Sequence, residues 1–185
     1  MKLAHLINPV LVNENSDLFI AQPITFETMR LAKCAYKEPA NIDLIAVHFL
    51  EDEPFAPKDF LKAPYLAKSA QDIAELENPK KLPFIADILR HGAEVTNADY
   101  LIYTNADIAL AENFYSEVSR YIEEGYDAFS ITRRCLEPIY TSTLDIPSMW
   151  KDSGKPHPGW DCFVFKREVL DEFLLDNIFI GAPGV

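Results

Sequence analysis

A chain of 185 residues is long enough to form one domain that buries most of the surface of its unfolded state. Its apolar fraction of 49% and charged fraction of 25% are typical of a globular protein and argue against long disorder. A net charge of −12, with no run of Lys or Arg longer than two residues, argues against nucleic acid and anionic lipid as partners. An anionic substrate would therefore need a local cation.

The compartment is also predicted from composition. No apolar run approaches the ~20 residues that a bilayer-spanning helix requires, so we expect no membrane span. Polar residues follow Met1 too early for a signal peptide. Cys34, Cys135 and Cys162 are far apart and lack C-x-x-C spacing, which favours reduced, packed thiols over a zinc site. We therefore expect a cytoplasmic protein.

Apolar segments typical of strands alternate with segments of helical periodicity along the chain. In chain order, we expect a strand over 3–7, a helix over 26–35, a strand over 42–50, a helix over 70–76, a helix from Pro83, a strand over 100–104, a helix over 112–124, strands over 127–132 and 160–165, and a helix near 168–175. This alternation predicts the α/β class, with a mainly parallel sheet flanked by helices in a single domain over residues 1–185.

Local signals predict where the first helices begin. Thr25 is a candidate cap for the first helix, after a polar loop that extends to Pro23. Ser69 and Asp72 have the spacing of a capping box. Pro83 suits the first turn of the helix that follows.

The helix over 112–124 has a clear amphipathic pattern. Gly125 follows it, at the position where a left-handed residue ends many helices. Its predicted apolar face consists of Phe114, Tyr115, Val118, Tyr121 and Ile122.

The first glycine of the chain is Gly92, so residues 1–91 contain none. A dinucleotide-binding G-x-G-x-x-G motif or a P-loop would have to follow the first strand, so the sequence contains neither there. The same absence excludes the Gly-rich loop that sugar-phosphate nucleotidyltransferases use. Any phosphate must therefore be held in another way.

The strand over 100–104 ends in the polar triplet Asn105-Ala106-Asp107. Its apolar residues do not alternate with polar ones, which is typical of a strand buried on both faces of a parallel sheet. Open α/β sheets bind ligands outside the carboxyl ends of their strands, so Asp107 and Asn105 are candidate ligands for Mg²⁺ or Mn²⁺. Alternatively, Asp107 caps or bends the turn before the next helix.

Two basic pairs are candidate phosphate sites. Lys80-Lys81 lies directly before the helix predicted from Pro83, and a helix N-terminus with a cation attracts anions. Arg133-Arg134 follows the strand over 127–132 and faces either phosphate or neighbouring acids. The acid Asp52, after the second strand, is a candidate hydrogen-bond acceptor for a nucleoside. For all of these residues, the alternative is a solvated surface or a local ion pair.

A third candidate site extends from His157 to Asp161. Trp160 offers a flat apolar face and Asp161 an acceptor or base, a combination that suits polyols. The alternatives are that His157 is a turn residue and that Asp161 forms an ion pair. The candidate partners of that pair are Arg133, Arg134 and Lys166.

The order of these features resembles that of the GT-A glycosyltransferases, especially the family 2-like inverting enzymes. The resemblance covers most of residues 1–170. It is most specific at the strand that ends in N-A-D, a variant of D-x-D, and at the stretch P-G-W-D-C-F-V-F-K-R. Its other elements are Ile7-Asn8-Pro9 after the first strand, a helix rich in small and apolar residues from Thr25, the acids that end Val47–Asp52, and Lys81 before a helix.

The resemblance implies a nucleotide-sugar donor and a hydroxyl acceptor, either a glycan or a small molecule. A divalent cation, Mn²⁺ or Mg²⁺, would bind at Asp107 and Asn105 and stabilise the leaving diphosphate. Asp161 would be the catalytic base, with Trp160 and His157 on the acceptor side. The donor-binding residues would be Pro9, Asp52, Lys81, Asn105 and Arg133.

Two features depart from the family pattern. The N-A-D triplet replaces one metal carboxylate by an amide, and the chain stops at residues 181–185, where family members often continue with acceptor-side helices. We therefore expect either a minimal domain or a part of a longer protein. The alternatives are a non-catalytic module that binds a nucleotide or glycan or serves assembly, and a sugar-phosphate nucleotidyltransferase, which the missing Gly-rich loop disfavours.

Overall fold

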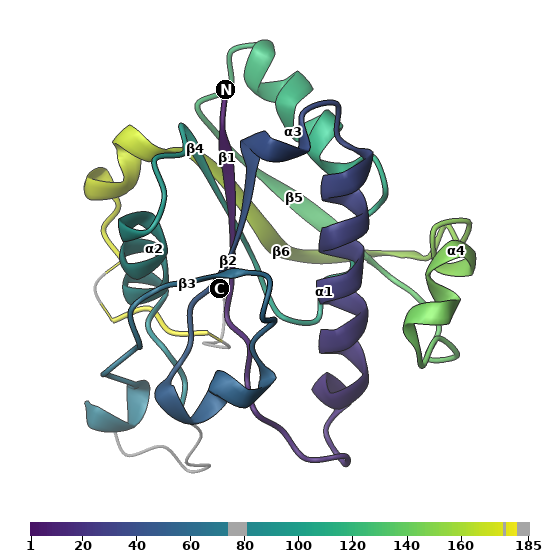
Figure 1. The fold of residues 1–185 in the computed structure, drawn as a ribbon, viewed down its shortest axis with the longest axis horizontal. Coiled ribbons are helices and arrows are strands. Elements are labelled where there is room, and N and C mark those ends of the chain that lie inside the picture. The colour runs from purple at the N-terminus through teal and green to yellow at the C-terminus, as the bar shows by residue number, and fades with distance from the viewer. Residues whose placement is uncertain (74–80, 176, 181–185) are drawn as a thin grey trace.

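The computed structural model describes residues 1–73, 81–175 and 177–180. These residues form a six-stranded sheet in the order β3-β2-β1-β4-β6-β5 (Figure 1). Strands β1 to β4 are parallel, and β6 is antiparallel to both β4 and β5. The strands are β1 (Leu3–Ile7), β2 (Ile42–Ala46), β3 (Leu61–Lys62), β4 (Tyr100–Thr104), β5 (Ala128–Cys135) and β6 (Lys155–Lys166). The predicted α/β class with a mainly parallel sheet is confirmed.

Helices cover both faces of this sheet. α1 (Asp17–Ala35) and α3 (Phe114–Glu123) pack against one face, and α2 (Ile85–Glu94) packs against the other (Figure 1). A short helix, α4 (Ile146–Met149), lies in the connection between β5 and β6. Gly125 follows α3 with a φ of 99°, as predicted. Among the described residues, no helix combines the length and the apolar character needed to cross a membrane.

Two hydrophobic cores lie on opposite faces of the sheet, and β1 contributes to both. Leu3 and Ile7 pack on the face of α1 and α3, whereas Ala4 and Leu6 pack on the face of α2. Every residue of β1 is buried. Burial on both faces explains why the parallel strands are continuous apolar runs in the sequence.

Helix α1 begins well before Thr25, its predicted cap. Ser16 is the cap, because its side chain accepts a hydrogen bond from the backbone N–H of Leu18 (3.3 Å). Pro23 lies inside the helix, where proline usually breaks the backbone hydrogen bonding. The ring of Pro23 is exposed, and Phe26, Met29 and Ala32 of the same helix pack in the core on this face of the sheet. Packing thus outweighs a local signal that predicts a loop.

Three other predicted elements are shorter or shifted. β2 ends at Ala46, because the chain bends into a 3₁₀ helix over Leu50–Phe55. α2 starts after Pro83, because Pro83 instead forms an isolated β-bridge with Ser69. The predicted C-terminal helix is a 3₁₀ helix over Arg167–Glu172, whose apolar residues pack on the α2 face.

The predicted capping box is present, but the predicted helix over 70–76 is not observed as such. The Asp72 carboxylate accepts a hydrogen bond from the backbone N–H of Ser69 (2.6 Å). The element that follows is a 3₁₀ turn over Ala70–Asp72, and residues 74–76 lie outside the described residues. β5 and β6 are both longer than the predicted strands, because much of each is polar and half-buried.

The three cysteines are free thiols. Cys162 is buried, whereas Cys34 and Cys135 are exposed. The prediction of packed thiols is therefore wrong for two of the three, since Cys34 lies on the outer side of α1 and Cys135 at the end of the edge strand β5.

Candidate functional site

The carboxyl ends of the parallel strands β1, β2 and β4 lie side by side at one end of the sheet, which we call its carboxyl edge. Open α/β sheets bind ligands at this place. β6 runs in the opposite direction, so its first half approaches the same edge. Thr104 of β4 pairs with Cys162 of β6, and the next residues outward are Asn105 and Asp161. The fold thus brings the N-A-D triplet and the candidate base to the same edge.

The side chain of Asn105 is held by the buried strand that precedes it. Tyr103 donates a hydrogen bond to Oδ1 of Asn105 (3.0 Å). Burial, with a smaller contribution from the Asp107 carboxylate, keeps the pKa of Tyr103 well above its ordinary value, so Tyr103 remains a donor. Asp107 is exposed in the turn after β4, and the residue that precedes α3 is Asn113. Asp107 therefore does not cap that helix.

Asp161 lies where β6 departs from regular pairing. Its neighbours Trp160 and Cys162 pair with successive residues of β5, so Asp161 is the extra residue of a bulge. Its Oδ1 accepts a hydrogen bond from Nη1 of Arg133 (2.9 Å), an ion pair that the sequence analysis kept as an alternative. Its Oδ2 is buried and has no hydrogen-bond partner among the described residues. One carboxylate oxygen is thus anchored by Arg133, and the other is buried and unpaired among the described residues.

His157 lies against the same arginine. Nη2 of Arg133 is 3.2 Å from Nε2 of His157, and Nδ1 of His157 accepts a hydrogen bond from the backbone N–H of Gly159 (3.0 Å). A neutral imidazole has one acceptor nitrogen, so it satisfies only one of these donors. Nδ1 is also 3.9 Å from Oδ2 of Asp161. Arg133, His157 and Asp161 thus form one cluster of side chains.

Trp160 lies beside this cluster and is 62% exposed. It pairs across the strands with Thr132 of β5, and residues directly opposite each other project from the same face of a sheet. A large exposed ring next to a carboxylate is a surface on which a sugar ring can stack.

Two candidate donor residues meet at the loop between β1 and α1: Pro9 belongs to it, and Asp52 contacts it from the 3₁₀ helix over Leu50–Phe55. Pro9 is buried directly after β1. Asp52 is also buried, and its Oδ1 accepts a hydrogen bond from the backbone N–H of Leu11 (2.8 Å). Burial raises the pKa of Asp52, and the Leu11 hydrogen bond opposes that shift. The contact observed for Asp52 is therefore one that holds the loop in place.

Lys81 lies beside the end of β2 and not at the start of α2. Its ammonium group pairs with Glu51 and lies 4.1 Å from the centroid of the Phe49 ring. Both partners of the ion pair are exposed, so a stronger anion can compete for Lys81. Lys80 lies outside the described residues.

Two polar side chains of this edge, Tyr103 and His48, are not among the site residues predicted from the sequence. Tyr103 belongs to the apolar run of its strand, but it is two residues before Asn105 and therefore projects from the same face. Nδ1 of His48 bonds to the carbonyl oxygen of Phe49 (2.8 Å), and its buried Nε2 has no partner among the described residues. The signal was a histidine at the end of an otherwise apolar run.

The predicted cation ligands offer a small donor set. Within residues 1–73, 81–175 and 177–180, no group of three or more His, Cys, Asp or Glu side chains is arranged to hold a metal ion. Asp107 supplies one carboxylate, and the amide oxygen of Asn105 already accepts from Tyr103. Mg²⁺ commonly keeps several waters and binds through one or two carboxylates plus substrate phosphates. These residues fit such a cation only together with a phosphate-bearing ligand.

No family model and no curated protein matches the sequence. Among solved structures, the chain is similar to 4-diphosphocytidyl-2C-methyl-D-erythritol synthase from Anaerococcus prevotii, with 10% identity over 96% of this chain and 78% of that one and a TM-score of 0.49. It is also similar to Rv0371c from Mycobacterium tuberculosis in complex with manganese (14% identity, 93% and 74%, TM-score 0.45). A third similar structure is S. aureus TarS 1–349 (8% identity, 93% and 49%, TM-score 0.46), of which this chain spans about half. At these identities the likeness concerns the arrangement of the chain alone.

Proposed function

We propose that this chain is the donor-binding and catalytic part of a nucleotide-sugar-dependent transferase, and that it transfers the sugar to a hydroxyl acceptor. The observation that carries the proposal is the free, buried Oδ2 of Asp161 at the carboxyl edge of the sheet. An uncompensated carboxylate oxygen inside a protein is costly, and a ligand hydroxyl would satisfy it.

On the acceptor side, Asp161 is the general base and Trp160 the stacking surface. Arg133 holds Oδ1, which keeps Oδ2 oriented, and His157 supports Arg133 from the other side. The proton of the acceptor hydroxyl moves to Oδ2 of Asp161 as the acceptor oxygen bonds to the anomeric carbon of the sugar. The bond between that carbon and the diphosphate oxygen breaks, and the nucleoside diphosphate leaves.

On the donor side, the nucleotide lies along the ends of β1 and β2. Pro9 and Asp52 shape the nucleoside end, and Lys81 exchanges Glu51 for the donor diphosphate. Asp107 and Asn105 would hold Mn²⁺ or Mg²⁺ together with the donor phosphates. When bound, the cation neutralises the charge that develops on the leaving diphosphate.

A thermal-shift screen of UDP- and GDP-sugars with Mn²⁺ tests the donor side of this proposal. We expect one donor to raise the melting temperature and Asp107→Ala to abolish the shift. A panel that gives no shift would instead favour a non-catalytic module. Release of pyrophosphate from a nucleoside triphosphate and a sugar phosphate would favour a nucleotidyltransferase.

A matched pair of aspartate variants tests the role of Asp161. We expect Asp161→Asn to keep the donor-induced shift and to lower the transfer rate by about 100-fold or more, because general bases contribute factors of that size. Asp171→Asn, at an exposed aspartate in the 3₁₀ helix after β6, is the control and should leave both unchanged. Equal loss of donor binding and transfer in Asp161→Asn would show that Asp161 is only a structural partner of Arg133.

A further inference from the structure

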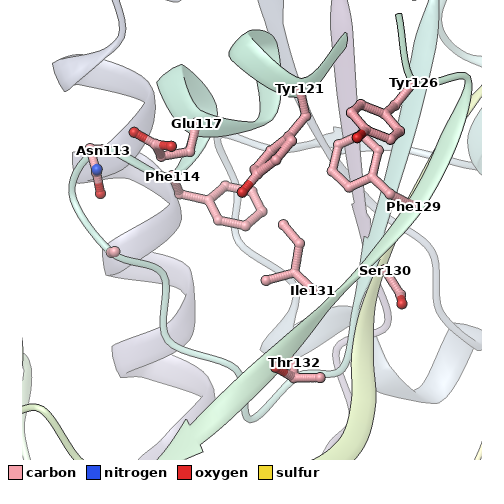
Figure 2. A pocket seen from close by; sticks show the side chains of 10 residues that line it. Asn113, Phe114, Glu117, Tyr121, Tyr126, Phe129, Ser130, Ile131 and Thr132 are labelled. Carbon is pink, nitrogen blue, oxygen red and sulfur yellow. The ribbon is translucent and has the colours of Figure 1, made fainter. Parts of the chain in front are cut away.

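A groove of about 590 Å³ lies between α3 and the edge strand β5 (Figure 2). Four consecutive residues of β5 line it, namely Phe129, Ser130, Ile131 and Thr132. The side chains of Phe129 and Ile131 face α3, whereas those of Ser130 and Thr132 lie on the opposite face of the sheet (Figure 2). Residues of both faces line one groove where it runs along the backbone between them. The groove therefore follows the outer side of β5.

β5 lacks most of the features that protect an edge strand. It pairs with β6, and among the described residues no strand pairs with its outer side. The strand at the other end of the sheet, β3, has only two residues, whereas β5 has eight. Edge strands are commonly protected by proline, by charged side chains or by bulges. β5 contains no proline, and the extra residues at both register shifts belong to β6, so β5 itself stays regular.

The two charged side chains of β5 are held within the chain. Arg133 contacts the Asp161 carboxylate and the ring of His157. The guanidinium of Arg134 donates to two backbone carbonyl oxygens of the connection that leads to β6. Because both arginines have partners in their own chain, neither projects freely from β5 to repel another strand.

An exposed aromatic cluster lies beside the outer side of β5. The rings of Tyr121, Tyr126 and Phe129 contact one another, with centroid distances of 6.1 Å, 5.5 Å and 6.4 Å. Tyr126 is 51% exposed and Tyr121 is 37% exposed, although the pattern of α3 predicts Tyr121 in the core. The helical pattern is correct in phase, but no part of the described chain covers this end of α3. A further strand beside β5 would bury part of this apolar surface.

The pairing with β6 decides which backbone groups of β5 face outward. The backbone N–H of Lys166 donates to the carbonyl oxygen of Asp127, and successive residues of an antiparallel strand bond alternately to either side. The odd-numbered residues of β5 therefore bond toward β6, and the even-numbered residues present their N–H and C=O groups to the groove. An antiparallel partner strand must place residues that bond outward opposite residues that do the same.

A second copy of β5 complements the first in charge and in side-chain type. When two copies pair antiparallel about a two-fold axis through Ser130, Asp127 of each copy lies opposite Arg133 of the other. On the same face, Phe129 of each copy lies opposite Ile131 of the other. This register keeps the alternation of hydrogen bonds, whereas a shift by one residue would break it. Opposite charges and aromatic–β-branched pairs are both favourable across strands.

We propose that two copies of this chain associate through β5 and form one continuous sheet across a two-fold axis through Ser130. This inference is independent of the proposed transferase function, but it bears on the candidate site. Arg133 contacts Asp161 and His157 through Nη1 and Nη2, and a guanidinium has more N–H donors than these two contacts use. Asp127 of the partner subunit then becomes a second carboxylate at the arginine that holds Asp161.

Sedimentation of the protein over a range of concentrations tests the association. We expect the wild type to change from monomer to dimer between about 1 and 100 µM, as for a specific interface of micromolar affinity. Ser130→Pro should stay monomeric at these concentrations, because it removes the outward N–H at the centre of the interface. Proline is tolerated on an edge strand where the missing N–H faces outward, so urea denaturation should show a stability close to that of the wild type.

A matched pair of charge reversals tests the predicted ion pair between the copies. Asp127→Arg should weaken the dimer by about tenfold or more, because it places like charges opposite each other twice in a two-fold dimer. Asp171→Arg changes the net charge by the same amount at an exposed site after β6, and it should leave the dimer unchanged.

Engineered cysteines test the register. They are introduced with Cys34→Ser and Cys135→Ser, which remove the two exposed thiols. Ser130→Cys should oxidise to a disulfide-linked dimer, because its Cα would lie about 5.5 Å from that of its counterpart, within the range that a disulfide spans. Thr132→Cys should not link, because its counterpart would lie about 13 Å away along the paired strands.

The proposal is overturned if the wild type is a monomer at every concentration, or if Ser130→Pro and Asp127→Arg both dimerise as well as the wild type. A dimer in which Thr132→Cys links as fast as Ser130→Cys would also overturn it, since the two-fold axis would then not pass through Ser130. Equal loss of the dimer in Asp127→Arg and Asp171→Arg would assign the effect to net charge and contradict the pairing.

Discussion

The parallel strands and the β5–β6 hairpin belong to one sheet, but they differ in burial and in the regularity of their pairing. All residues of β1 and β4 are buried, whereas exposed and half-buried residues alternate along β5. The parallel strands pair in regular register, while the hairpin carries register shifts. The hairpin supplies Asp161, Arg133, His157 and Trp160, and the parallel strands supply mainly core.

The two regions therefore contribute to different properties, the parallel strands to folding stability and the hairpin to ligand binding. Buried apolar side chains supply most of the free energy of folding, and they tolerate little change. Half-buried strands leave polar side chains within reach of ligands, and bulges re-aim them. We therefore expect substitutions in the parallel strands to act on stability, and those in the hairpin to act on ligand binding and transfer.

The largest effect is expected for a matched pair of isoleucines, one in each region. Ile102→Ala, in β4, should lower the free energy of unfolding by about 2–5 kcal/mol, because Ile102 is fully buried. Ile131→Ala, in β5, removes a partly buried side chain and should cost less than about half as much. Urea denaturation measures both, and equal losses would contradict the division between the two regions.

A second effect comes from His5, a buried histidine of β1. Its ring nitrogens lie 2.9 Å from the hydroxyls of Tyr115 and Thr104, and burial lowers its pKa from 6.5 to about 3. The unfolded chain therefore binds a proton below pH 6.5 that the folded chain excludes, so stability falls as the pH falls. The slope from this group is small near neutral pH and approaches about 1.4 kcal/mol per pH unit well below pH 6.5.

Urea denaturation at pH values from neutral to about 5 measures this slope, and His5→Gln should flatten it. The control is His91→Gln, which removes a half-buried histidine of α2 and should leave the slope of the wild type in place. A wild-type curve with the same slope as that of His5→Gln would show that His5 does not exclude the proton.

A smaller effect is expected in the hairpin. Arg133→Met should lower the free energy of unfolding by about 1 kcal/mol, because it leaves the Asp161 carboxylate, 12% exposed, without its partner. Arg133→Met with Asp161→Asn should recover most of that loss, since the buried charge is then gone. A double variant as unstable as the sum of the single variants would show that the two side chains do not interact.

The smallest effect on stability is expected for Lys81→Met. Its ion pair with Glu51 is exposed on both sides, so the free energy of unfolding should change by less than about 1 kcal/mol. Donor binding should weaken by more than stability does, because Lys81 would contact the diphosphate. A loss of stability without a loss of donor binding would assign Lys81 to the structure alone.

The sequence predicted the parallel strands well because residues buried on both faces must be apolar, which leaves a continuous run such as Tyr100–Thr104. It missed the start of α1, since Pro23 is a strong local signal against a helix, and the contacts that override it are distant in sequence. It underestimated β5 and β6, because half-buried, bulged strands contain polar residues that resemble loops.

For the candidate site, the sequence indicated the residue types and the ends of the strands, but not the partners. Asp161 and Arg133 are 28 residues apart, and Lys81 and Glu51 are 30 apart, so no local pattern links either pair. The groove between α3 and β5 had no signal except a tyrosine on an apolar helix face.

By itself, the sequence determined the alternation of strands and helices and the acid that ends the central strand, because burial and turn chemistry act on neighbouring residues. The tertiary structure alone decided which oxygen of Asp161 is anchored and which is free, and that Tyr121 and Tyr126 face an open groove. Those properties depend on contacts between segments that are far apart in the sequence, and no local pattern shows which segments meet.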